Sequence, residues 1–91
     1  MHVLMIGHLT GKDYSELLQE EGMFIAKARA EGAVRDVFLK ADRSGPVLLL
    51  PDTTADDARE RMAGLPFITH DIASFDYIEL IDPPAGLPGS K

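Results

Sequence analysis

The segment from Gly32 to Leu50 constrains the fold more than any other part of the chain. It predicts a helix end at Gly32, a strand over Ala33–Ala41, a tight turn over Asp42–Gly45 and a second strand over Pro46–Leu50. Apolar residues occupy both parities of the first strand, and the second strand is apolar throughout. A sheet with one face in water should alternate apolar and polar residues. We therefore expect both faces of this sheet to be covered, and a short chain can cover only one of them.

Size and composition set further limits. A chain of 91 residues forms one domain, and a domain this small buries little more than roughly 60 % of its unfolded surface. The net charge of −6 argues against binding to nucleic acid or to an anionic membrane, because phosphate binding requires a basic surface. The absence of cysteine excludes disulfides, thiolate catalysis and cysteine metal sites. The opening MHVLMIG is too short for a signal peptide, and no apolar run approaches the ~20 residues of a membrane span, so we expect a cytoplasmic protein.

The rest of the chain predicts two helices and two more strands. In chain order, the predicted elements before the hairpin are a strand over 2–8 and a helix over 13–31, which starts with a capping box at Asp13 and Glu16. After the hairpin we expect a helix that is capped by Thr53 or Thr54 and ended by Gly64. An irregular connection over 66–72 and a strand over 75–81 follow it. This βαββαβ order is typical of the α+β ferredoxin-like fold, a four-stranded antiparallel sheet with two helices on one face.

The predicted fold leaves one sheet face bare in a single copy. Residues 1–82 form the domain, and residues 83–91 form a Pro/Gly-rich tail that is either disordered or laid across a neighbouring subunit. Covering several hundred Å² of apolar sheet contributes on the order of ten kcal/mol before the costs of association. We therefore expect a homodimer formed by sheet-to-sheet packing, or a higher oligomer.

Four segments resemble a known family: Gly32–Val37, Ala41–Leu50, Leu65–Pro66 and Asp76–Leu80. Over roughly residues 3–84 the chain resembles the muconolactone isomerase-like family, a branch of the dimeric α/β-barrel group that also contains YCII-related proteins and small antibiotic-biosynthesis monooxygenases. The resemblance implies a dimer whose two sheets pack as a barrel, with a ligand cavity between sheet and helices. Relatives usually carry small residues where this chain has His70 and Asp71, and Arg or Lys where it has His8.

Glu21 is the first candidate catalytic residue. It falls in the centre of the apolar stripe of the long helix, where an isolated charge is costly, so its carboxyl group must be paired, protonated or open to a cavity. A raised pKa there would suit proton abstraction next to a carbonyl. The resemblance adds that the family tends to place an acid at this position. The alternative is a structural ion pair with Arg35 or Lys40. Phe24, on the same helix stripe, is a candidate substrate contact.

Two histidines are further catalytic candidates. His70 and Asp71 follow the Leu65–Pro66 turn, and they could form an oriented acid/base pair or be ordinary polar loop residues. His8 ends the first strand, and its imidazole titrates near working pH, which makes it a candidate proton shuttle.

Two residues of the sheet are candidate substrate contacts. Arg35 could hold a substrate carboxylate through a bidentate contact. The alternative partners of Arg35, in a structural ion pair, are Glu21, Asp76 and Glu79. Tyr77 shares its parity with Phe75, and the two could form an aromatic wall of the cavity or simply belong to the core.

Several kinds of site have no support in the sequence. The histidines lack metal-ligand spacing, and the chain has neither a phosphate-binding glycine loop nor a GxSxG elbow, so we expect no metal and no cofactor. The leading hypothesis is a cofactor-free isomerase or cyclase that moves a proton on a small oxygenated molecule such as a lactone, an enone or a polyketide-like intermediate. The alternatives are a cofactor-free monooxygenase of the same fold and a non-catalytic binding or assembly protein.

Overall fold

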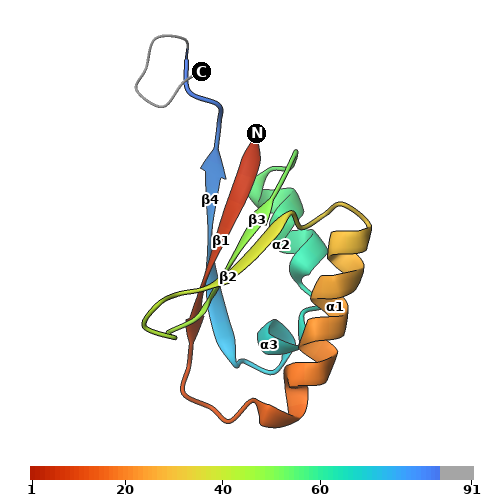
Figure 1. Cartoon of the computed structure of the whole chain (residues 1–91), viewed down its shortest axis with the longest axis vertical. Coiled ribbons are helices and arrows are strands. Elements are labelled where there is room, and N and C mark those ends of the chain that lie inside the picture. The colour runs from red at the N-terminus through yellow and green to blue at the C-terminus, as the bar shows by residue number, and fades with distance from the viewer. Residues whose placement is uncertain (85–91) are drawn as a thin grey trace.

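The computed structural model describes residues 1–84 and contains a four-stranded antiparallel sheet with its helices packed on one face (Figure 1). In chain order the elements are β1 (His2–Leu9), the 3₁₀ turn η1 (Ser15–Leu17), α1 (Leu18–Ala30), β2 (Asp36–Leu39), β3 (Pro46–Leu50), α2 (Ala55–Met62), α3 (Pro66–Thr69) and β4 (Ala73–Leu80). The strand order is β2-β3-β1-β4, with every pairing antiparallel. This α+β arrangement is compatible with the predicted ferredoxin-like fold. The predicted tail lies outside the described residues from residue 85 onward.

The core lies between the sheet and the helices. Alternate residues of β1 are buried, as the period of two in a strand requires. Side chains from the strands and side chains from the helices and their adjoining loops form one buried cluster, which consists of Val3, Met5, Ala28, Val34, Leu48, Leu50, Ala58, Met62 and Leu65. The helices therefore cover one face of the sheet and no more.

The opposite face of the sheet is apolar and has no cover within the described chain. The strand register places Leu4 between Leu49 and Ile78, both of which are apolar. Phe38 is 63 % exposed and Ile78 is 44 % exposed. We call the following residues the outer apolar face: Leu4, Ile6, Phe38, Val47, Leu49 and Ile78. An apolar surface of this kind was expected from the lack of alternation in the hairpin.

Two predicted elements differ from the structure. The strand predicted over 33–41 is limited to Asp36–Leu39, because the N–H groups of Ala33 and Val34 donate to the carbonyl of Ala28 and complete the end of α1. The connection predicted over 66–72 contains the short helix α3, and Pro66 occupies its first turn, where a missing N–H costs nothing. The prediction of an irregular connection was therefore wrong for Pro66–Thr69.

The two predicted helix starts have different outcomes. The capping box at Asp13 and Glu16 was wrong as a start of α1, because the carboxylate of Asp13 accepts from the N–H of Ser15 and orders the turn before η1. Of the two candidate caps of α2, Thr54 is the one used. Its hydroxyl accepts from the N–H of Asp57 at 3.2 Å.

β1 and the turn between β2 and β3 approach each other closely at two glycines. A Cβ atom on Gly45 would overlap the backbone carbonyl of Gly7. We expect Gly45→Ala to lower the free energy of unfolding, measured in urea, by roughly 2–3 kcal/mol. Gly22→Ala is the matched control, because a Cβ at this helical position meets no atom within 4 Å, and it should raise stability by roughly 0.5–1 kcal/mol. Equal effects of the two variants would contradict this explanation.

Candidate functional site

The three predicted catalytic residues lie in three separate places. Glu21 is buried on α1, facing α3. His8 lies on the outer side of the sheet near the end of β1, and His70 is exposed where α3 ends. Among residues 1–84, no hydrogen bond or ion pair joins any two of them. One chain therefore does not assemble them into a single site.

Glu21 is the most deeply buried ionisable side chain among the described residues, with 6 % of its surface exposed. The N–H of Phe67 donates to its Oε1 atom at 3.0 Å. Phe67 lies in the first turn of α3, whose N–H groups have no partner within their own helix. Burial raises the pKa of Glu21, and the hydrogen bond from Phe67 acts in the opposite direction with a smaller effect. The carboxyl group therefore joins α1 to the start of α3.

The ion pairs predicted for Glu21 and Arg35 were wrong. The Nε of Arg35 donates to Oδ2 of its neighbour Asp36 at 2.9 Å, on the exposed surface. Lys40 contacts His8. Glu21 is bound by a backbone N–H instead of a cation, so its charged form receives less compensation for burial than an ion pair would supply.

This geometry predicts how stability changes with pH. Because the pKa of Glu21 is raised in the folded chain above its ordinary value of 4.5, its stabilising contribution is present at low pH and is lost as pH rises through the folded-state pKa. Glu21→Gln keeps an oxygen for the Phe67 N–H and removes the titration, so the stability of this variant relative to the parent should increase as pH rises above about 4.5.

Glu21→Ala is the matched comparison. It leaves the Phe67 N–H without a partner and opens a cavity, which should cost roughly 2–3 kcal/mol. Urea unfolding of both variants at several pH values checks the pair. A glutamine variant that is as unstable as the alanine variant at every pH would contradict this role for Glu21.

His8 belongs to a polar cluster on the outer side of the sheet. Its Nε2 lies 2.9 Å from Oδ2 of Asp76, and its Nδ1 lies 3.3 Å from Nζ of Lys40. An ammonium group has only donors, so Nδ1 must accept, and Nε2 then carries the hydrogen that it donates to Asp76. A neutral imidazole is thus held between a carboxylate and an ammonium. We call these three residues the His8–Asp76–Lys40 cluster.

The cluster borders the outer apolar face. Asp76 pairs directly with Ile6 in the antiparallel register of β1 and β4, and His8 lies two residues further along the same face of β1. The side chains of His8 and Asp76 are 49 % and 71 % exposed, so in a single chain their attraction is weakened by water. Asp76 and Lys40 were not predicted as members of this site. Parity could have placed Asp76 on this face, but the register that brings it to His8 could not be predicted.

His70 and Asp71 lie together on the surface, but they do not interact with each other. Asp71 adopts a φ of 61° and lies 3.7 Å from the ammonium of Lys12, and His70 lines a shallow depression with Lys12 and Glu16. Their side chains form no hydrogen bond among the described residues, so the acid/base pair proposed from adjacency is not assembled.

The two aromatic candidates lie on the helix-covered side of the sheet. Tyr77 packs against the core beneath the guanidinium of Arg59, which is 4.7 Å from its ring centre. Burial raises the pKa of Tyr77, and Arg59 offsets part of this effect. Phe24 packs against the same core from α1 and lines a groove beside Arg61.

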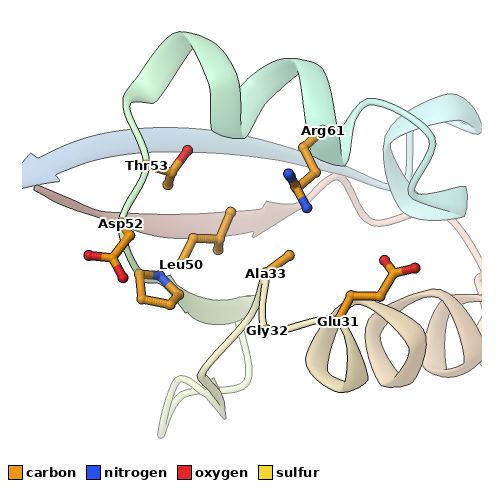
Figure 2. A pocket seen from close by; sticks show the side chains of 8 residues that line it. Glu31, Gly32, Ala33, Leu50, Asp52, Thr53 and Arg61 are labelled. Carbon is orange, nitrogen blue, oxygen red and sulfur yellow. The ribbon is translucent and has the colours of Figure 1, made fainter.

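A pocket of about 220 Å³ opens where the end of α1, the end of β3 and α2 meet (Figure 2). Its lining combines charged side chains with a small apolar floor and consists of Glu31, Gly32, Ala33, Leu50, Pro51, Asp52, Thr53 and Arg61. None of the residues proposed from the sequence belongs to this lining. No sequence motif marks the pocket, because its residues come from three segments.

Comparison with known proteins does not assign the chain to a family. No family model matches it, and no curated protein matches it. Within the described residues, no helix has the length and apolar character needed to cross a membrane. Over the same part of the chain, no three acidic or histidine side chains come together as ligands for a metal ion.

Proposed function

We propose that this chain is a cofactor-free acid/base enzyme, an isomerase or cyclase that moves a proton on a small oxygenated molecule such as an unsaturated lactone or an enone. The observation that carries the proposal is the His8–Asp76–Lys40 cluster at the border of the outer apolar face. It supplies a neutral imidazole, a carboxylate that orients it and a cation beside its accepting nitrogen.

The proposal includes a second copy of the chain packed sheet to sheet as a dimeric α/β barrel. The apolar residues in the middle of the outer face support it, because a standard interface needs about 800 Å² from each partner and an apolar centre. Lys40 and Asp36 provide opposite charges around that face, which suits a two-fold self-complementary contact. Excluding water there would strengthen every interaction of the cluster. A relationship to the muconolactone isomerase-like family is part of the same proposal, and the strand order is compatible with it.

The proposed chemistry uses one proton and needs no co-reactant. When Lys40 moves its hydrogen bond from Nδ1 of His8 to the substrate carbonyl oxygen, Nδ1 is free to take a proton from the carbon next to that carbonyl, and the C–H electron pair forms a dienolate. Lys40 stabilises the negative carbonyl oxygen, and Asp76 stabilises the imidazolium that has formed. The imidazolium exchanges its N–H hydrogen with solvent and then delivers a proton to the γ carbon, so the double bond shifts without any net gain or loss of atoms. Arg35 precedes β2 and Lys40 follows it, so Arg35 lies too far from the His8–Asp76–Lys40 cluster of the same chain to contact a small substrate bound there.

Proton NMR in heavy water tests the proposal. A β,γ-unsaturated five-membered lactone is the probe, and we expect the protein to produce the conjugated isomer with deuterium at the γ carbon, at a rate proportional to protein concentration. Glu21→Gln separates the two candidate bases: it should retain the reaction if His8 is the base and abolish it if Glu21 is. No acceleration over buffer with lactones and enones would contradict the proposal. Consumption of oxygen instead of isomerisation would favour a cofactor-free monooxygenase.

A further inference from the structure

The pocket between α1, β3 and α2 carries two opposite charges, those of Arg61 and Glu31, that form no ion pair with any residue of the described chain. We infer that it binds a small zwitterion with one carboxylate and one ammonium group, such as a free amino acid. Arg61 would take the carboxylate and Glu31 the ammonium. This site lies on the helix side of the sheet and shares no residue with the His8–Asp76–Lys40 cluster. The inference therefore does not depend on the proposed enzymatic function.

Arg61 is the anion-binding group of the pocket. The ion pairs within residues 1–84 are His8–Asp76, Lys12–Asp71, Arg35–Asp36 and Arg59–Asp56, and none includes Arg61. Figure 2 shows its guanidinium reaching from α2 into the space above Ala33. A guanidinium stays charged in proteins and presents paired N–H donors that match a carboxylate. A carboxylate ligand would use donors that the described chain leaves open.

Glu31 supplies the opposite charge from the end of α1. Its side chain takes part in none of the hydrogen bonds or ion pairs of the described chain, although it lines the same pocket as Arg61. The two side chains are therefore opposite in charge, lie on one cavity and are not in contact. Asp52 also lines the pocket, but its carboxylate is directed away from the space between Arg61 and Ala33 (Figure 2). A ligand that carries both charges fits this arrangement better than a simple anion does.

The floor and size of the pocket restrict the rest of the ligand. Ala33, Leu50 and Pro51 provide the apolar lining, and Leu50 is 1 % exposed. A volume of about 220 Å³ is below the roughly 300–1,000 Å³ of sites for drug-sized ligands. A free amino acid therefore suits the space, and a nucleotide does not.

Backbone contacts hold one wall of the pocket in place. The N–H of Thr53 donates to the carbonyl of Met1 at 3.0 Å, and the N–H of Asp52 donates to Nδ1 of His2 at 3.1 Å. Asp52 has a positive φ of 51°, so the chain turns sharply where β3 ends. This wall therefore requires little rearrangement before a ligand enters, which lowers the cost of binding.

Titration of the full chain with L-leucine, followed by the NMR shifts of the backbone N–H groups of Ala33 and Thr53, tests this inference. We expect saturable shifts with a dissociation constant of about 1 mM, a reasonable value for so small a ligand. N-acetyl-leucine lacks the ammonium and leucinamide lacks the carboxylate. Each should bind at least about tenfold more weakly than L-leucine.

Two variants identify the groups responsible. Arg61→Gln and Glu31→Gln should each weaken L-leucine binding about tenfold or more, because each removes one charged partner of the ligand. Arg29→Gln is the matched control on the exposed surface of α1, outside the pocket lining, and it should not change binding. The spectra also report whether each variant is folded. Absence of saturable shifts, equal binding of the two analogues and L-leucine, or unchanged binding by Arg61→Gln would each overturn the inference.

Discussion

Leu4→Lys is expected to convert the proposed dimer into a monomer. Leu4 lies in the middle of the outer apolar face between Leu49 and Ile78, so a lysine there would meet apolar side chains of both copies. Burying an unpaired ammonium costs several kcal/mol, which corresponds to at least about a hundredfold weaker association. Sedimentation equilibrium measures the change directly, because it gives the mass of the particle in solution.

Met23→Lys is the matched control for this variant. Met23 is 64 % exposed on α1 and lies away from the sheet, so the same change of an exposed apolar residue to lysine should leave the mass unaltered. Circular dichroism of both variants would establish that they are folded. A Leu4→Lys variant that keeps the mass of the parent would show that this face does not hold the copies together.

His8→Gln is expected to reduce the proton-transfer rate by about 10²–10⁴-fold, the usual contribution of one general acid or base. The glutamine side chain can hydrogen-bond to Asp76 but cannot take up a proton at working pH. Asp76→Asn should cause a smaller loss, because it removes the charge that stabilises the imidazolium and leaves the base itself in place. The deuterium-incorporation assay measures both rates.

His2→Gln provides the matched control for His8→Gln. His2 lies at the other end of β1, where its Nδ1 accepts from the N–H of Asp52. The His2→Gln substitution should therefore leave the proton-transfer rate unchanged. An undiminished rate for His8→Gln, with the mass of the particle unchanged, would remove the His8–Asp76–Lys40 cluster from the mechanism.

Local signals in the sequence predicted much of the fold correctly. Asp42 orders the hairpin turn by accepting from the N–H of Ser44, and Arg43 takes the positive φ of 62° that such a tight turn requires. Thr54 caps α2 in the expected way. These contacts join residues that are two or three positions apart, so their chemistry can be recognised without knowing the rest of the fold.

Contacts between distant segments could not be predicted in the same way. The helical pattern placed Glu21 correctly in the apolar stripe, but its partner is the backbone of Phe67, in a segment predicted to be irregular. The contact between His8 and Asp76 depends on the register of β1 and β4, and parity alone does not determine register. The candidate site therefore became recognisable only after the strands had been paired.

Sedimentation equilibrium of the unmodified chain tests the central claim most directly, namely that a second copy covers the sheet face left open by the helices. At protein concentrations of tens of micromolar we expect a particle of at least about twice the chain mass of 9.9 kDa. A particle of 9.9 kDa that stays constant as concentration rises through this range would contradict the account.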